Sequence, residues 1–331
     1  MGAKDMARLA TLLRKLASPR DPPPGLVEER PDLLTRGGVA DDLYAPRGKA
    51  AGAVVAVHGA VVTGRKDARL RHMARCVAAS GVACAVPTLP GLARMELDPA
   101  DVVAIEGIVE ELHADLGPVR LAGFSYGASY SLVAAARPKT APRVRFALAV
   151  GPVRSFAELY DSYYETRDEP LKEGARADGT IYLRMAMAYR QRDHVGLDAG
   201  MRRSLEEILA RYCSASSAEE KRAFHDRWLA GARLSEIDYE RRNPDALEAI
   251  SPAGKLGGLR CRVGLIHDRG DHLVPVSHSE RLHAELLSLP DPRGHRLHVT
   301  SLLTHVSPTR LPGLGDAIGL ARILYPLMAA S

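Results

Sequence analysis

The sequence predicts an α/β fold, in which a mainly parallel sheet is flanked by helices and interrupted by one helical insertion. Three observations lead to this prediction. Short, uninterrupted apolar runs recur along the chain, and such runs are typical of strands buried on both faces of a parallel sheet. Segments with apolar residues at helical spacing separate these runs, so crossover helices are expected to join consecutive strands. One long block, about residues 154–250, has helical segments without a buried strand.

The N-terminal part of the sequence predicts an amphipathic helix followed by a stiff linker. Apolar residues recur there at helical spacing, with basic residues between them: Met6, Leu9, Leu12, Leu13 and Leu16. Residues 21–25, Asp-Pro-Pro-Pro-Gly, form the linker. The sequence lacks the apolar run of a secretory signal and the ~18 consecutive apolar residues of a membrane span, so a cytoplasmic protein is expected. The basic helix at residues 5–17 also suits peripheral contact with a membrane surface, although packing on its own domain is the more common use.

Strands and helices then alternate in a regular order. Strands are expected at residues 42–45, 53–57, 82–86, 119–122 and 145–150, and beyond the insertion at 261–266 and 296–300. Helices are expected at about 66–79, 100–115, 127–136, 277–288 and 313–329. The run Ala53–Val57, which contains only alanine and valine, is typical of a strand with no solvent-facing side.

Composition excludes several classes of protein. Of the 331 residues, 46% are hydrophobic and 26% are charged, which is typical of a globular protein with one large core or with a core and a small second unit. The 45 basic residues exceed the 40 acidic ones by 5, without a run of like charge, so no nucleic-acid partner is expected. The cysteines, Cys76, Cys84, Cys213 and Cys261, form no C-x-x-C pair and are expected to be buried thiols rather than zinc ligands or disulfides.

A G-x-S-x-G sequence lies directly between a predicted strand and a predicted helix. It reads Gly123-Phe124-Ser125-Tyr126-Gly127. A serine on so tight a turn is held in a strained conformation with its hydroxyl above the sheet edge, and the two glycines remove side chains that would collide there. The bare motif also fits an ordinary loop, but the strand and helix around it favour Ser125 as a nucleophile.

A serine nucleophile also needs donors for the oxyanion of its tetrahedral intermediate. His58-Gly59-Ala60 follows the apolar run 53–57 and meets this need. Gly59 lets the backbone turn, so that the N–H of Ala60 can point to the same place as the N–H of Tyr126. We expect these two amides to form an oxyanion hole, and His58 to hold the loop rather than to act as the base.

These motifs resemble those of the α/β-hydrolase superfamily, and in particular its serine esterases and lipases with a helical lid. The resemblance covers about residues 38–152 and 258–328. In this family the acid and the histidine follow the serine in chain order. The stretch from Leu265 to Pro275 resembles the acid-bearing loop, in which Asp271 matches the acid and Asp268 is the competitor.

The catalytic histidine of the family lies in the loop after the last strand, and His305 matches this position. The family often has glycine before this histidine, whereas Thr304 stands here. The alternatives fit less well, because His298 falls within a predicted strand and His295 lies in the turn before it. The resemblance therefore implies a triad of Ser125, His305 and Asp271.

The resemblance also implies a division of the chain. The expected parts are 1–25 (helix and linker), 26–153 (core with nucleophile and oxyanion hole), 154–250 (lid) and 251–331 (core with acid and histidine). In the lid, Phe156, Tyr160 and Tyr163 are candidates for the substrate pocket, with docking of the lid on the core as the alternative.

The implied function is hydrolysis of a carboxylic ester of a small acyl compound through an acyl-enzyme, without a metal or an organic cofactor. A thioesterase, peptidase, lactonase or carbon–carbon hydrolase would use the same triad, and a non-catalytic binding protein is a further alternative. Serine rather than aspartate at position 125 argues against dehalogenase and epoxide-hydrolase chemistry.

Overall fold

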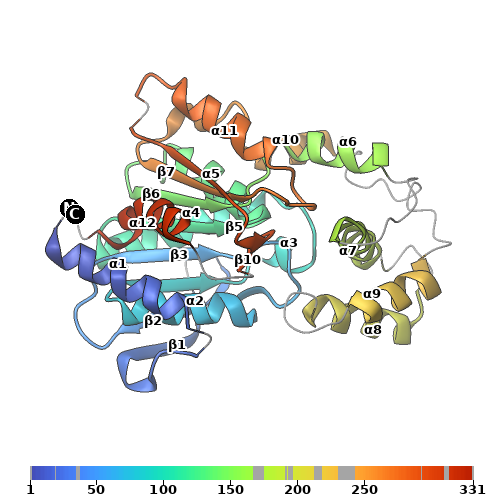
Figure 1. The fold of residues 1–331 in the computed structure, drawn as a ribbon, viewed down its shortest axis with the longest axis horizontal. Coiled ribbons are helices and arrows are strands. Elements are labelled where there is room, and N and C mark those ends of the chain that lie inside the picture. The colour runs from blue at the N-terminus through green and yellow to red at the C-terminus, as the bar shows by residue number, and fades with distance from the viewer. Residues whose placement is uncertain are drawn as a thin grey trace.

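The apolar runs of the sequence form the central strands of one eight-stranded sheet in this computed structural model (Figure 1). The strands lie in the order β1-β2-β4-β3-β5-β6-β7-β8. Their bounds are β1 Val27–Leu34, β2 Ala40–Pro46, β3 Ala53–Val57, β4 Ala83–Pro87, β5 Val119–Phe124, β6 Val144–Val150, β7 Arg262–Asp268 and β8 Arg296–Thr300. The structure describes residues 2–18, 20–34, 38–166, 175–190, 192, 197–211, 218–229, 243–291, 293–308 and 313–329.

Parallel pairing dominates the sheet, as the sequence predicts. β3 pairs in parallel with β4 and β5, and the parallel order continues through β6, β7 and β8. Only β2 breaks it, because it pairs antiparallel with both β1 and β4. In β3, Ala53, Val55 and Val57 face one core cluster. Val54 and Ala56 face the other, which explains why this strand has no polar position.

Helices cover both faces of the sheet. On one face lie α4 (Ala100–Leu116), α5 (Tyr126–Ala136) and α11 (Ser277–Leu287). On the other lie α1 (Ala3–Leu16), α2 (Ala68–Ala79) and α12 (Leu314–Met328). Figure 1 shows α1 beside α12, with the two ends of the chain close together. α5 is buried on every side, which its many alanine, serine and glycine residues permit.

The block at 154–250 contributes helices, with no strand among its described residues. These are α6 (Phe156–Thr166), α7 (Ala175–Arg190), α8 (Ala199–Arg211), α9 (Ala218–Phe224), the π-helical η3 (His225–Leu229) and α10 (Pro244–Ile250). Figure 1 shows α7, α8 and α9 gathered to one side of the sheet. They share their own apolar cluster, to which Ile181, Leu205 and Phe224 belong.

One edge strand and several short elements are absent from the sequence prediction. β1 is an edge strand that carries Glu28, Glu29, Arg30 and Pro31, so no apolar run marks it; proline is tolerated there because an edge strand leaves N–H groups unpaired. The others are α3 (Pro90–Ala93), the two-residue strands β9 (Leu303–Thr304) and β10 (Ser307–Pro308), and the 3₁₀ turns η1 (Pro24–Leu26), η2 (Gly64–Lys66) and η5 (Leu256–Gly258). Each is too short to show a period.

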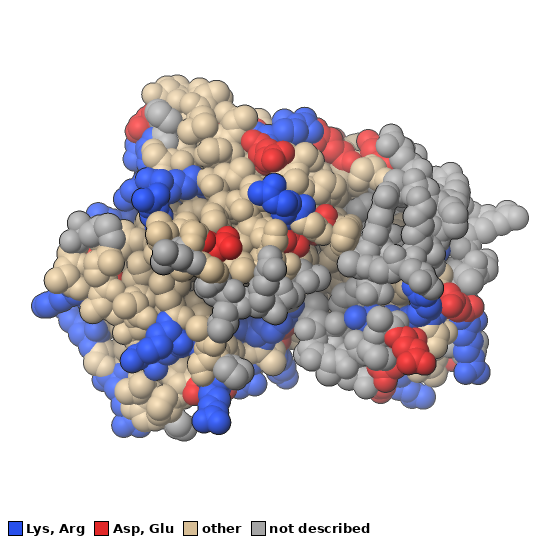
Figure 2. Space-filling view, viewed as in Figure 1, with Lys and Arg blue, Asp and Glu red and all other residues tan. Residues whose placement is uncertain are grey.

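The remaining predictions from composition concern cysteines, charge and membrane spans. Cys76, Cys84 and Cys261 are free, buried thiols, and Cys213 lies outside the described residues. On the face drawn in Figure 2, Lys and Arg lie in small groups with Asp and Glu among them. Every helix in the described ranges is too short or too polar to cross a bilayer.

Candidate active site

Ser125 lies between the carboxyl end of β5 and the start of α5, near the middle of the sheet. Its backbone has φ 52° and ψ −126°, a conformation that is strained for any residue other than glycine. Its N–H donates a hydrogen bond to the Val150 carbonyl at 2.8 Å, which fastens the turn to the end of β6. A strained residue held in this way is typical of a functional position.

The two glycines around Ser125 allow the turn to approach the loop after β3. A Cβ on Gly127 would overlap the carbonyl oxygen of His58. A Cβ on Gly123 would overlap the first turn of α5 at Gly127. Because both positions lack a side chain, Gly59 comes to lie directly beside Ser125. The two motifs singled out from the sequence therefore meet at one place.

His305 contacts both Ser125 and Asp271. It lies in the turn between β9 and β10, with a positive φ of 58°. Its Nε2 is 2.8 Å from Ser125 Oγ, and its Nδ1 is 2.6 Å from Asp271 Oδ2. The carboxyl ends of β5, β7 and β8 meet at one edge of the sheet, so the three side chains converge although they are far apart in sequence.

The Asp271 carboxylate is fully buried but well supplied with donors. Its Oδ1 accepts hydrogen bonds from the N–H groups of Leu273 and Val274, both at 2.9 Å. Burial alone would raise the pKa of Asp271, but the charge and hydrogen bonds of His305 and His267 outweigh it and hold the pKa well below its ordinary value. An ionised Asp271 accepts the Nδ1–H of His305, which leaves the lone pair on Nε2 facing Ser125.

His267, which the sequence does not single out, contacts the carboxylate of Asp271. Its ring is fully buried, with Nε2 2.9 Å from the Val274 carbonyl and 3.4 Å from Asp271 Oδ2. Since a carbonyl can only accept, Nε2 carries the hydrogen, and Ser279 Oγ donates to Nδ1 at 2.6 Å. The only sequence signal for this residue is its place beside Asp268 at the end of an apolar run.

Asp268 contacts the same loop but not the imidazole. It is the last residue of β7, and its carboxylate accepts the backbone N–H groups of Gly270 and His305. Burial raises the pKa of Asp268 despite these bonds. Of the two aspartates considered, Asp271 is thus the one in contact with the ring of His305.

The other two candidate histidines lie away from Ser125. His298 faces α12, where its Nε2 is 3.3 Å from Asp316 Oδ1. His295 is buried before β8, and its Nδ1 accepts the N–H of Val263 at 3.0 Å. Within the described ranges, no group of three or more His, Cys, Asp and Glu residues is arranged to hold a metal ion.

His58 uses both ring nitrogens to hold the loop after β3. Its Nε2 accepts the N–H of Leu89 at 2.9 Å, so its Nδ1 carries the hydrogen and donates to the Gly59 carbonyl at 2.6 Å. Burial lowers the pKa of His58 to about 4 and keeps it neutral. The loop that it holds carries Ala60, which lines the cavity at Ser125 together with Tyr126. The Tyr126 N–H belongs to the first turn of α5, where helix geometry supplies no acceptor.

Ser125 and His305 lie in the wall of a cavity of about 1020 Å³. On one side this cavity is lined by Tyr182, Ala186 and Arg190, which follow one another at four-residue spacing on one face of α7. Tyr182 donates a hydrogen bond to the Ala60 carbonyl at 2.8 Å. The block at 154–250 thus reaches the loop beside Ser125. Tyr182 and Arg190 are not among the residues that the sequence singles out, although their helical spacing is visible in it.

The three aromatic candidates of α6 have different positions. Tyr160 lines the cavity, and its hydroxyl accepts a hydrogen bond from Arg190 at 3.2 Å. Phe156 lies in the core instead of the cavity wall, because its ring packs edge-on against Tyr126, with centroids 4.8 Å apart. The side chain of Tyr163 lies outside the described residues.

Comparison with known proteins was informative only at the level of structure. The sequence matches no family model and no curated protein sequence. An esterase of Pyrococcus furiosus is similar in structure, with a TM-score of 0.51 and 12% identity over 92% of this chain and 91% of that chain. A 2,6-dihydroxy-pseudo-oxynicotine hydrolase superposes with a TM-score of 0.49 and 17% identity over 92% of this chain and 68% of its own. The likeness to the esterase agrees with the strand order and with the strand–serine–helix turn at Ser125, and the chain has the α/β-hydrolase fold.

Proposed function

We propose that this chain is a serine hydrolase that cleaves a carboxylic ester through an acyl-enzyme. The hydrogen-bond chain from Ser125 Oγ through the ring of His305 to Asp271 carries the proposal, with distances of 2.8 and 2.6 Å. A serine hydroxyl is a weak nucleophile, and a base within hydrogen-bond reach that is oriented by a third group is what activates it. The strained backbone of Ser125 adds support, because such strain is kept where function needs it.

Acylation would follow from these contacts. Ser125 Oγ attacks the acyl carbon while its proton passes to His305 Nε2, and the carbonyl electron pair moves onto oxygen. The N–H groups of Ala60 and Tyr126 receive the resulting oxyanion, and each such donor is worth ~3 kcal/mol in the transition state. When the intermediate collapses, the bond to the leaving alcohol breaks and the alcohol takes the proton from His305.

Deacylation would use the same groups in reverse order. A water molecule gives a proton to His305 Nε2 and attacks the acyl carbon, and the oxyanion forms again at the same two amides. Ser125 then leaves with the proton from His305, and the carboxylic acid is released. Asp271, kept ionised by its donors, stabilises the imidazolium ring in both halves of the cycle.

The block at 154–250 would act as the lid of this site, and residues 26–153 and 251–331 as its core. Tyr160 and the cavity-lining face of α7 lie over the cavity that contains Ser125. The bond from Tyr182 to the Ala60 carbonyl joins the lid to the loop that bears an oxyanion donor. A lid in this place would limit the access of water, which strengthens the electrostatic interactions beneath it.

A fluorophosphonate probe tests the proposal, because it forms a covalent bond only with an activated serine. The wild-type protein should be labelled at one site per chain and should hydrolyse nitrophenyl esters. Ser125→Ala should lose both properties while keeping its circular dichroism spectrum. Ser277→Ala, which changes an exposed serine at the start of α11, should behave as the wild type. An unlabelled wild type, or equal labelling of Ser125→Ala, would favour a non-catalytic binding protein instead.

A further inference from the structure

The cavity at Ser125 has a second arm that the proposed chemistry does not use. It lies between the sheet and the layer formed by α1, α2 and α12, and we call it the helix-side channel. Ala122, Leu148 and Ile266 line it from the sheet. Leu12, Met73 and Leu320 line it from the three helices.

The direction of the channel follows from strand geometry. Side chains along a strand alternate between faces, so Ala122 of β5 faces the layer of α1, α2 and α12. Leu148 of β6 and Ile266 of β7 face the same layer. All three strands end at the edge where Ser125 and His305 meet. The channel therefore runs from the serine hydroxyl along one face of the sheet, beneath the helices.

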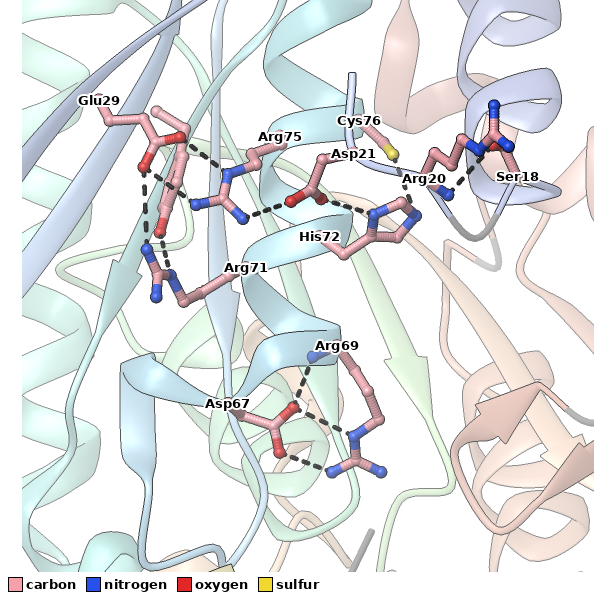
Figure 3. Close-up of polar contacts among 11 residues, drawn as sticks. Ser18, Arg20, Asp21, Glu29, Asp67, Arg69, Arg71, His72, Arg75 and Cys76 are labelled. Carbon is pink, nitrogen blue, oxygen red and sulfur yellow. Dashed lines mark hydrogen bonds and ion pairs between the residues drawn. The ribbon is translucent and has the colours of Figure 1, made fainter. Parts of the chain in front are cut away.

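Asp67, Arg69 and His72 of the channel wall all have polar partners. Figure 3 shows Arg69 bound to Asp67, with hydrogen bonds of 2.7 and 3.1 Å. His72 Nδ1 is 2.8 Å from Asp21 Oδ1, and its Nε2 is 3.6 Å from Cys76 Sγ. Since these charged and polar groups already have partners, the channel offers a ligand mainly apolar contact.

We propose that the helix-side channel holds a long, unbranched aliphatic chain of the ester whose carbonyl group is attacked by Ser125. This inference rests on the proposed function and adds a substrate class to it. The whole cavity, about 1020 Å³, is at the upper end of the ~300–1000 Å³ of small-molecule sites and exceeds the needs of a short acyl group. An apolar wall favours methylene groups, and each one buried is expected to raise kcat/KM by about fourfold until the channel is full.

The test measures kcat/KM of the wild type against two series of esters. In nitrophenyl esters the acyl chain grows from two to sixteen carbons, and in alkyl acetates the alcohol chain grows instead. We expect a steep rise with chain length in one series, which also tells whether the acyl or the alcohol side enters the channel. A flat profile in both series would overturn the inference.

Two variants then localise the chain. Met73→Trp and Leu320→Trp change half-buried channel residues and should lower the ratio of long-chain to short-chain kcat/KM at least tenfold. Ile318→Trp is the matched control, because Ile318 lies on α12 but is 46% exposed and does not line the channel, so it should keep the ratio. The inference is wrong if all three variants keep the wild-type ratio of long-chain to short-chain kcat/KM. Two variants are used so that one poorly folded protein does not decide the result.

A binding measurement separates this inference from the proposed function. Ser125→Ala protein should bind a fluorescent sixteen-carbon fatty acid at one site, and the additional change Met73→Trp should weaken that binding at least tenfold. If no ester is cleaved but the fatty acid binds in this way, the channel stands and the hydrolase proposal fails. If short esters are cleaved and the fatty acid does not bind, the hydrolase proposal stands and the channel inference fails.

Discussion

Two aspartates three positions apart meet His305 in different ways. Asp271 contacts the ring at 2.6 Å, whereas Asp268 accepts the backbone N–H of the same residue. The first contact selects the tautomer of the imidazole, and the second only holds its loop. The proximity of a carboxylate to a histidine in sequence therefore says little about its role until the accepting atom is known.

This difference predicts unequal effects of the two amide substitutions. Asp271→Asn should lower kcat on a nitrophenyl ester by about 10³–10⁴-fold, because an amide does not hold the Nδ1–H tautomer or stabilise the imidazolium. Asp268→Asn should lower kcat less than about tenfold, since an amide oxygen still accepts the N–H of His305. Circular dichroism would show whether both variants are folded. The reverse order of effects would exchange the two roles.

Asp41 is a buried carboxyl group outside the active site, and it makes stability depend on pH. It lies in β2 and is 1% exposed, and its Oδ1 has no hydrogen-bond partner in the described part of the chain. Burial, with the charges of Glu111 and Asp42, raises the pKa of Asp41 to about 7 in the folded protein. The unfolded chain keeps a value near 3.8, so unfolding releases a proton from Asp41 between about pH 4 and pH 7, and the contribution of Asp41 to stability falls as pH rises through this window.

Asp41→Asn removes the pH-dependent contribution of this carboxyl group to stability. The free energy of unfolding of the variant, relative to the wild type, should increase by about 1 kcal/mol per pH unit across the window and then level off. Urea unfolding at several pH values measures this difference in the free energy of unfolding. Asp115→Asn, at an exposed position near the end of α4, should show no such slope. If the free energies of unfolding of Asp41→Asn and the wild type change in parallel with pH, the carboxyl group of Asp41 is already ionised in the folded protein at low pH.

At the scale of elements, strand prediction succeeded where burial leaves a clear pattern. β3 and β4 are buried along their whole length, and their sequences contain the continuous apolar runs that such strands require. β1 lies at the edge of the sheet, where Glu28, Glu29, Arg30 and Pro31 are all exposed, so no apolar run marks it. β9 and β10 have two residues each, yet they form the turn that carries His305. Their pairing depends on contacts beyond the reach of a local pattern.

In the candidate site, too, the residues that a local sequence pattern marks were predicted, and the others were not. Ser125, Asp271 and His305 each come after a strand that the sequence predicts, and the parallel order of these strands brings the three residues to one edge. Tyr182 and Arg190 come from α7, and nothing local in the sequence says which face of an inserted helix turns toward the serine. For Phe156 the sequence left two positions open, because an aromatic residue at the start of the insertion suits a pocket wall and a core position equally well.

The contact between α5 and the loop after β3 gives a prediction at this scale. Gly127→Ala adds a methyl group where the His58 carbonyl already lies, so the helix and the loop must separate. We expect a loss of kcat/KM of about 100-fold or more, because an oxyanion donor displaced by an ångström loses most of its effect. Gly257→Ala is the matched control, since nothing lies within 4 Å of a Cβ there. Equal activity of both variants would show that the loop adapts.

At the scale of the whole molecule, the two ends of the chain complete the second face of the sheet. α1 and α12 lie together over the strands, and Leu9 and Leu12 of α1 join the core cluster formed with α12. Figure 3 shows how the segment that follows α1 is held, with Arg75 of α2 bound to Asp21 and to Glu29 of β1 at 2.9 and 2.8 Å. Exposed ion pairs contribute little each, so the apolar contacts of α1 dominate its attachment.

That attachment gives the last prediction. The amphipathic sequence of α1 suits either a membrane surface or the domain itself, but Leu9 is only 2% exposed, whereas Met6 on the same helix is 41% exposed. Leu9→Ala should therefore lower the free energy of unfolding by about 2–5 kcal/mol, the cost of a cavity in a packed core. Met6→Ala should change it by less than about 0.5 kcal/mol. Urea unfolding without lipid measures both, and two equally small effects would mean that α1 leaves the core in solution and is free to lie on a membrane.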